Sequence, residues 1–229
     1  FTGIEIWNYM SSFKNRLAEA LEKLPLKQMW LAKLIAVRMA LSPEKVITRP
    51  EPETLALWDG LLAQGKRIVA IGNSDAHGTP MSIGPITREI YPYDFLFRAV
   101  NTHLLVPDPL GNDLDKDKRM ILRAIGNGNA FVGYDMPHPT RGFRFSGKGR
   151  GHGIMGDRIK LDAGATLQAH ASLNGAMRLI RHGEVVAAEE NNTTLTFTPV
   201  VPGAYRIECD IDYHGRSRGW IYSNPIYVY

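Results

Sequence analysis

The sequence predicts an α/β domain followed by a small all-β domain, and three patterns support this prediction. Residues 3–8 read as a strand, helical segments follow, and residues 67–72 form a continuous apolar run. Such a run is typical of a strand covered on both faces, and the order strand, helices, strand predicts a parallel sheet. Apolar and polar residues alternate in the last third, which indicates strands with one wet face. We therefore expect an α/β domain over 1–136, a Gly-rich linker over 137–156 and a β-sandwich over 157–229.

Helices are expected between the first two strands. Ser11 or Ser12 is a suitable cap for a helix over 11–24, and the segment from Met29 to Met39 is a second helical candidate. Residues 53–63 give the clearest helix, because Pro52 fits its first turn and Gly65 fits the left-handed residue that ends a helix. We expect loops over 47–52 and 78–92.

The remaining elements follow from breaks in the pattern. Ala99–Val106 and Ala130–Gly133 are expected strands, and Asp115–Ile125 is an expected helix that stops at Gly126. Five glycines crowd the end of the proposed linker, where we expect a flexible loop. Alternation then predicts the strands of a small immunoglobulin-like sandwich, with a turn at Pro202 and Gly203. The alternating stretches are 167–172, 194–198 and 205–212.

Composition narrows the function classes. Hydrophobic residues make up 44% of the 229 residues and charged residues 22%, values typical of a soluble globular protein. The net charge is +4, but Lys and Arg form no long run, so we expect no nucleic-acid partner. No apolar stretch is long enough to span a membrane, and we expect no membrane partner. The single cysteine, Cys209, excludes an internal disulfide and a cysteine-based zinc site, and it leaves the compartment unknown.

The start of the chain reads as the middle of a domain. Phe1 is followed at once by an alternating strand pattern, with neither an initiator Met nor the charged and apolar regions of a signal peptide. We therefore expect that further polypeptide precedes this sequence or that another chain completes the domain.

The strongest chemical motif follows the second predicted strand. In the stretch Gly72-Asn73-Ser74-Asp75-Ala76-His77-Gly78, Asp75 and His77 are two residues apart and would point the same way on an extended chain. A carboxylate and an imidazole together suit Zn, Mn or Fe, and ligands bind beyond the carboxyl ends of parallel strands. The alternative is a loop in which Asp75 caps a turn and His77 is solvated.

Other polar residues are weaker candidates. Glu5 and Asn8 lie at the end of the first strand and could line a substrate pocket, although Asn8 could equally cap the following helix. His103 is expected to be a hydrogen-bonded histidine within the core. His138 and His152 flank the Gly-rich segment together with arginines, an arrangement that suits an anion or simply a solvated loop.

The sequence resembles the PHP (polymerase and histidinol phosphatase) superfamily. The stretch from Leu57 to Gly78, which includes Ile-Gly-Asn-Ser-Asp-Ala-His-Gly, looks like the last metal motif of that group. Residues 3–8 are similar to an earlier barrel strand, residues 121–132 resemble the helix, turn and strand that close the barrel, and residues 220–228 resemble the terminus of two-domain members. The resemblance implies a distorted (β/α)7 barrel with up to three divalent metals, and it carries Asp75 and His77 over as metal ligands.

This sequence departs from the family pattern in one important respect. The family's other ligands are mostly histidines that precede this motif, but no histidine precedes His77 here. Two ligands cannot complete a site that needs four or more. Either the upstream half lies outside this chain, or the site has been lost. A partial barrel would leave open sheet edges, so we expect stable folding only with the missing segment or with another chain.

Three functions are consistent with these features. The resemblance implies hydrolysis of a small phosphoester, with a metal-bound hydroxide as the nucleophile. Hydrolysis of carboxylic or carbamic esters is the alternative within the same superfamily. A non-catalytic binding module beside a degenerate barrel is the alternative from another class.

Overall fold

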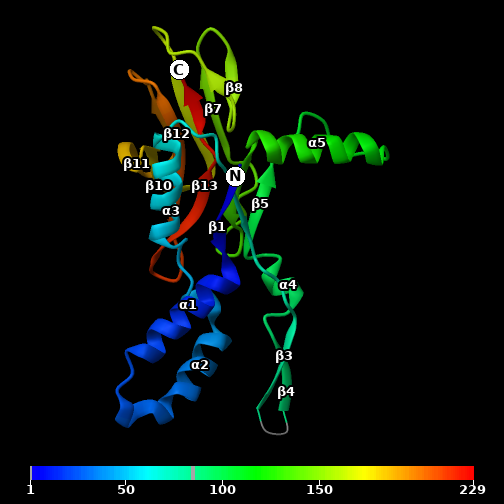
Figure 1. Cartoon of the computed structure of the whole chain (residues 1–229), viewed down its shortest axis with the longest axis vertical. Helices are drawn as coiled ribbons and strands as arrows, with labels where there is room; N and C mark the ends of the chain where they lie inside the picture. The colour runs from blue at the N-terminus through cyan, green and yellow to red at the C-terminus, as the bar shows by residue number, and fades with distance from the viewer. Residues whose placement is uncertain (1, 84–85) are drawn as a thin grey trace.

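A computed structural model describes residues 2–83 and 86–229. The fold is mixed α/β with mostly β content, and it includes a large curled antiparallel sheet (Figure 1). The helices are α1 (Tyr9–Glu22), η1 (Leu26–Leu31), α2 (Ala32–Leu41), η2 (Pro43–Lys45), α3 (Pro52–Ala63), α4 (Tyr93–Leu96) and α5 (Leu114–Asn127). The strands are β1 (Gly3–Asn8), β2 (Val69–Asn73), β3 (Thr79–Ile83), β4 (Ile86–Ile90), β5 (Val100–Leu104), β6 (Ala130–Tyr134), β7 (Arg144–Lys148), β8 (His152–Ile154), β9 (Arg158–Ile159), β10 (Thr166–Arg181), β11 (Glu184–Phe197), β12 (Gly203–Asp212), β13 (Ser217–Ser223) and β14 (Ile226–Val228).

The expected parallel pair of strands is confirmed. β1 and β2 form a two-stranded parallel sheet in which Gly3 is opposite Val69 and Asn8 is opposite Asn73. The helices α1, α2 and α3 lie between these strands in the chain. Because the two strands run in the same direction and in register, their carboxyl ends meet at one edge. In the described part of the chain, β1 pairs with β2 alone.

The first helix begins earlier than the sequence suggests. Asn8, rather than Ser11 or Ser12, is the N-cap of α1, because its Oδ1 accepts a hydrogen bond of 2.8 Å from the Ser11 backbone N–H. An Asn side chain satisfies one of the donors that a helix start leaves unpaired. The prediction of a serine cap was therefore wrong by one turn.

The C-terminal strands form one continuous sheet. Its order is β5-β6-β13-β12-β10-β7-β8, with β11 beside β10 and with β14 and β9 beyond β12. The first part of β10 pairs with β7 and the last part pairs with β12, so this long strand curls across the sheet. Strands β5 and β6 pair antiparallel and join the sheet through β13. The two facing layers of the expected sandwich are thus replaced by a single curled sheet that extends past the predicted domain boundary.

Two segments predicted as loops contain strands. The Gly-rich segment 137–156 includes β7 and β8, which pair antiparallel. Its glycines serve close packing, because a Cβ on Gly147 or Gly153 would be 2.6 Å or 2.9 Å from the Ile159 side chain. The predicted loop over 78–92 contains the β3–β4 hairpin, with residues 84–85 outside the described part.

Two side chains take the place of a neighbouring strand along the second edge of β2. The amide of Asn224 accepts a hydrogen bond from Ala70 N–H at 2.7 Å and donates to the Ala70 and Ala130 carbonyls at 2.9 and 3.0 Å. Two residues further along β2, Thr102 Oγ1 accepts a hydrogen bond from the Gly72 N–H at 2.9 Å and donates one to the Gly72 carbonyl at 2.6 Å. Strand β2 is therefore held between the backbone of β1 and two side chains of the C-terminal sheet.

The absence of a side chain at Gly72 permits this packing. A Cβ at this position would overlap the Val132 side chain and would be 3.0 Å from Val100 Cγ1. Strand β2 thus lies close against β5 and β6. The aromatic core around Trp7 and Trp58 also includes Tyr134 and Tyr222 of the curled sheet. The segment from β1 to β2 and the curled sheet therefore share one buried cluster.

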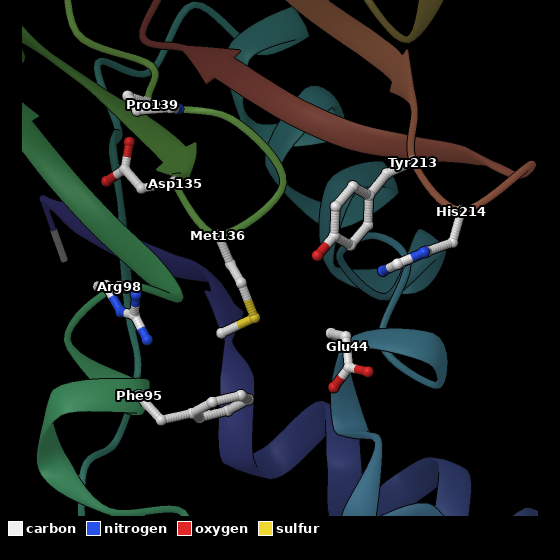
Figure 2. A pocket seen from close by; sticks show the side chains of 8 residues that line it. All are labelled: Glu44, Phe95, Arg98, Asp135, Met136, Pro139, Tyr213 and His214. Carbon is white, nitrogen blue, oxygen red and sulfur yellow. The ribbon is translucent and has the colours of Figure 1, made fainter.

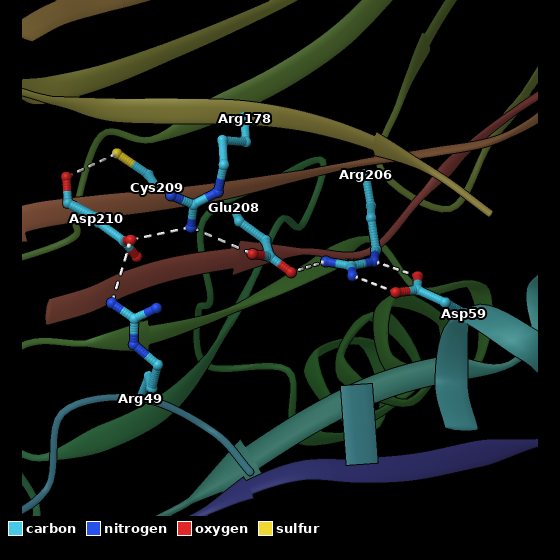
Figure 3. Close-up of polar contacts among 7 residues, drawn as sticks. All are labelled: Arg49, Asp59, Arg178, Arg206, Glu208, Cys209 and Asp210. Carbon is cyan, nitrogen blue, oxygen red and sulfur yellow. Dashed lines mark hydrogen bonds and ion pairs between the residues drawn. The ribbon is translucent and has the colours of Figure 1, made fainter. Parts of the chain in front are cut away.

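A chain of buried charges joins α3 to the curled sheet (Figure 3). Asp59 accepts two hydrogen bonds from Arg206, at 2.7 and 2.6 Å, and both residues are buried. Glu208 bridges Arg206 and Arg178 at 2.7 and 3.3 Å, and Asp210 then bridges Arg178 and Arg49 at 2.9 and 3.5 Å. Removing one partner of such a chain would leave an uncompensated buried charge, so the chain fixes how α3 sits on the sheet.

No helix within residues 2–83 and 86–229 combines the length and the apolar character needed to cross a bilayer.

The Asn224 contacts make a testable prediction about stability. Asn224→Leu removes the side-chain partner of the Ala70 N–H and carbonyl groups, so we expect the free energy of unfolding to fall by about 2–4 kcal/mol in urea titrations. Asn15→Ala, a change at an exposed position on α1, is the matched control and should alter it by less than about 0.5 kcal/mol. Equal effects of the two substitutions would contradict the role given to Asn224.

Candidate functional site

The Asp75–His77 motif begins where β2 ends, at Asn73. The chain does not continue extended as the sequence analysis assumed, because Asp75 has a left-handed backbone with φ of 52°. The two side chains nevertheless converge. His77 Nδ1 is 2.7 Å from the Asp75 carbonyl oxygen and 3.4 Å from its carboxylate Oδ1. The expected extended geometry was thus wrong, and a turn at Asp75 brings the His77 imidazole beside the Asp75 carbonyl oxygen.

Asn73 links this turn to β1. Its Oδ1 accepts a hydrogen bond of 2.5 Å from Asp75 N–H, and its Nδ2 donates to the Glu5 carboxylate. Asn8 Nδ2 donates to the other Glu5 oxygen at 3.4 Å, while its own Oδ1 caps α1. Asn8 is therefore a cap that also contacts the site. Glu5, Asn8, Asn73 and Asp75 form one hydrogen-bonded row across the ends of β1 and β2.

His77 Nδ1 donates its proton to the Asp75 carbonyl oxygen, so Nε2 is the ring nitrogen with a lone pair for a cation. Both side chains reach solvent, with exposed fractions of 29% for Asp75 and 68% for His77. Among residues 2–83 and 86–229 no group of three His, Cys, Asp or Glu side chains could hold a metal.

A pocket of about 570 Å³ opens beyond the carboxyl end of β6 (Figure 2). Its walls come from four separate segments, namely η2, α4, the end of β6 and the β12–β13 turn. Phe95, Met136 and Tyr213 give it an apolar surface. The charged and polar groups around them are Glu44, Arg98, Asp135 and His214. Side chains from distant parts of the sequence that converge on one cavity are typical of a ligand site.

Helix α4 connects the pocket to the Asp75–His77 motif. The pocket lining does not include either motif residue. Gly78 ends the motif against α4, because a Cβ there would be 2.9 Å from Tyr93 Cε2. The same helix presents Phe95 to the pocket, and Arg98 follows it directly. Helix α4 therefore has Gly78 beside Tyr93 and the pocket beside Phe95.

The Asp135 carboxylate at the pocket edge is already engaged by the protein. Its oxygens accept hydrogen bonds from the Asn101 amide at 2.9 Å and from the Thr140 hydroxyl at 2.6 Å, and His103 Nε2 is 2.8 Å away. Burial raises the pKa of Asp135, but the hydrogen bonds from His103, Thr140 and Asn101 outweigh it and lower the pKa to about 2. Asp135 is thus a fixed anion that orients the pocket wall.

Buried tyrosines lie beneath the same end of the sheet. Tyr9 and Tyr134 place their hydroxyls 3.5 Å apart, and burial raises the pKa of both, that of Tyr134 to about 12. Burial also raises the pKa of Tyr91, whose hydroxyl has no hydrogen-bond partner among the described residues. These three hydroxyls therefore stay neutral near pH 7.

The other histidines take structural or surface positions. His103 stacks on Phe131 with ring centroids 4.7 Å apart and contacts Asp135, so it is hydrogen-bonded as expected, but it is half-buried rather than within the core. His138 packs edge-on against Trp220, and His152 is exposed on β8. The described contacts thus give no support to an anion site built from His138 and His152.

Sequence reasoning missed several residues that shape the site. Asn73 gave a weak signal, since it directly ends a strand and precedes the motif. Thr102 and Asn224 gave none, because their contacts with β2 depend on how distant segments pack. Tyr213 and His214 gave no signal either, because alternation cannot show that the β12–β13 turn lines the pocket beside β6.

The hydrogen bonds around Asp135 predict a pH dependence. The pKa of Asp135 is about 2 in the folded protein, against 3.8 for the same group without these contacts. Because the folded pKa is the lower one, the ionised carboxylate stabilises the fold above about pH 4, and this stabilisation is lost as the pH falls toward 2. We expect Thr140→Val to raise the pKa of Asp135, measured by carboxyl ¹³C NMR, because it removes one donor. A pKa near 3.8 in the unmodified protein would contradict this account.

The chain matches no protein-family model, no curated protein and no solved structure.

Proposed function

We propose that the chain belongs to a metal-dependent hydrolase of the PHP type, a phosphoesterase whose cation is held in part by Asp75 and His77. The observation that supports this proposal is the position of Asp75 and His77 directly after β2, at the carboxyl end of a parallel strand. A parallel α/β arrangement places ligand sites at this edge. The cation is a divalent Zn, Mn or Fe ion.

The proposal includes a partial (β/α)7 barrel. The parallel pair β1–β2 and the three helices between them support it, because this is the repeating unit of such barrels. The remaining ligands, two or more donors with the family's preference for histidine, come from polypeptide outside residues 1–229. We expect that polypeptide to pair with the open edge of β1.

The residues of this chain divide into holding and positioning roles. When bound, the cation supplies Lewis acidity and a water of lowered pKa. Asp75 and His77 hold it, while Asn73 fixes the Asp75 backbone and ties it to Glu5. Glu5 and Asn8 face the same edge and contribute to substrate binding. Substitution of residues that orient metal ligands in this way commonly lowers metal affinity by about ten- to a hundredfold.

The pocket beside α4, lined by Phe95, Met136 and Tyr213, suits the organic part of a small ester. Phe95, Met136 and Tyr213 offer apolar contact, while Arg98 attracts an anionic group. A phosphate monoester combines both features. A carboxylic or carbamic ester would use the same cation and the same apolar wall, and it is the second candidate.

Substitution of both motif residues tests the proposal in the intact protein. We expect Asp75→Asn with His77→Gln to lower bound metal at least tenfold and the hydrolysis of an aryl phosphate at least about a hundredfold, since both ligands are lost. Metal is measured by mass spectrometry after gel filtration. His170→Gln, an exposed position on β10, is the matched control and should leave both values unchanged.

The substrate class follows from a second assay on the same samples. Hydrolysis of an aryl phosphate in preference to the matching aryl ester supports the phosphoesterase, and the reverse preference supports the ester hydrolase. Unchanged metal content and turnover in the double variant would reject both. Absence of metal and turnover in the intact protein itself would leave a non-catalytic binding module.

A further inference from the structure

A second pocket of about 530 Å³ lies at the opposite end of β2 from the Asp75–His77 motif. Arg67 borders it and precedes the strand, whereas Asn73 ends it. At about 3.3 Å per residue the two ends of this segment are roughly 20 Å apart. The end of α3, the β10–β11 turn and the start of β12 and end of β14 form the pocket walls, and β9 contributes Arg158. This pocket is therefore separate from the proposed hydrolytic site.

Arginines on aromatic rings line this pocket. The Arg67 guanidinium lies 5.1 Å from the ring centroid of Tyr227, and that of Arg158 lies 4.2 Å from the ring of Tyr229. Arg67 Nη2 also donates to the Gly156 carbonyl at 2.6 Å. Stacking on a ring restrains a guanidinium while leaving the edge with its N–H donors available. His182 adds a third basic group to the lining.

The described pocket carries no compensating carboxylate side chain. None of its lining residues is Asp or Glu, and neither Arg67 nor Arg158 makes an ion pair with a described residue. Asp59 approaches Gly183 at the edge, but Arg206 binds both of its oxygens.

The rest of the lining is apolar. Leu62, Pro202, Ala204 and Val228 form the wall beside the stacked arginines. A ligand that fits must pair a compact oxyanion with a flat or apolar body. The apolar wall distinguishes this pocket from a site for an inorganic anion, which would need polar groups alone.

We propose that this pocket binds a small phosphate monoester with an aromatic or apolar body, as a ligand site independent of hydrolysis. The phosphate contacts Arg67 and Arg158, because guanidinium groups suit phosphate oxygens. The body of the ligand packs against Leu62, Pro202 and Val228. The excess of four positive charges on the chain favours the approach of such an anion.

Calorimetric titration with phenyl phosphate tests this site. The titration uses the full chain carrying Asp75→Asn and His77→Gln in EDTA, so that binding at the proposed hydrolytic site does not contribute. We expect phenyl phosphate to bind at least tenfold more tightly than inorganic phosphate. Adding Arg67→Gln and Arg158→Gln should weaken binding at least tenfold, whereas Arg123→Gln on the exposed face of α5 should change it less than twofold.

Single substitutions protect the test against misfolding. Arg158→Glu alone should abolish binding with an unchanged circular dichroism spectrum, because Arg158 is exposed and its removal opens no cavity. Binding that is unaffected by the arginine substitutions would overturn the proposal. So would the absence of binding at 10 mM phenyl phosphate, or equal affinities for phenyl phosphate and inorganic phosphate.

Discussion

The hydrogen bonds from Asn224 and Thr102 to β2 attach the parallel pair β1–β2 to the large curled sheet. A strand normally satisfies both of its edges with neighbouring strands, but among residues 2–83 and 86–229 β2 pairs with β1 alone. The amide of Asn224 and the hydroxyl of Thr102 complete the other edge at Ala70 and Gly72. Because buried backbone groups are costly to leave unpaired, these two side chains determine where β2 lies.

The position of the candidate site follows from this constraint. Asn73 and Asp75 come directly after the last anchored residue, Gly72, so the turn that carries His77 starts from a fixed point. The parallel pairing with β1 brings Glu5 and Asn8 to the same edge. The buried Asp59–Arg206 pair then fixes α3, which leads into β2, against the curled sheet. The curled sheet therefore holds β2 and α3 in place, and the Asp75–His77 motif itself lies outside that sheet.

Local patterns predicted what depends on neighbouring residues. The apolar run before Gly72, the helix over 53–63 and the parallel relation of β1 and β2 all follow from short-range signals. The continuous curled sheet did not follow from them, because the pairing of β6 with β13 joins residues about ninety positions apart. The glycines over 147–156 suggested flexibility, yet they permit close packing against Ile159. Similarly, the spacing of Asp75 and His77 indicated their proximity, but the left-handed backbone at Asp75 produces it.

The most direct measurement of the central claim is anomalous X-ray scattering from crystals of the intact protein grown with Mn²⁺ or Zn²⁺. The account predicts an anomalous peak within about 2.3 Å of an Asp75 carboxylate oxygen and a His77 ring nitrogen, with further ligands from outside residues 1–229. A well-ordered Asp75–His77 turn without a peak, or a peak bound solely by other residues, would contradict it.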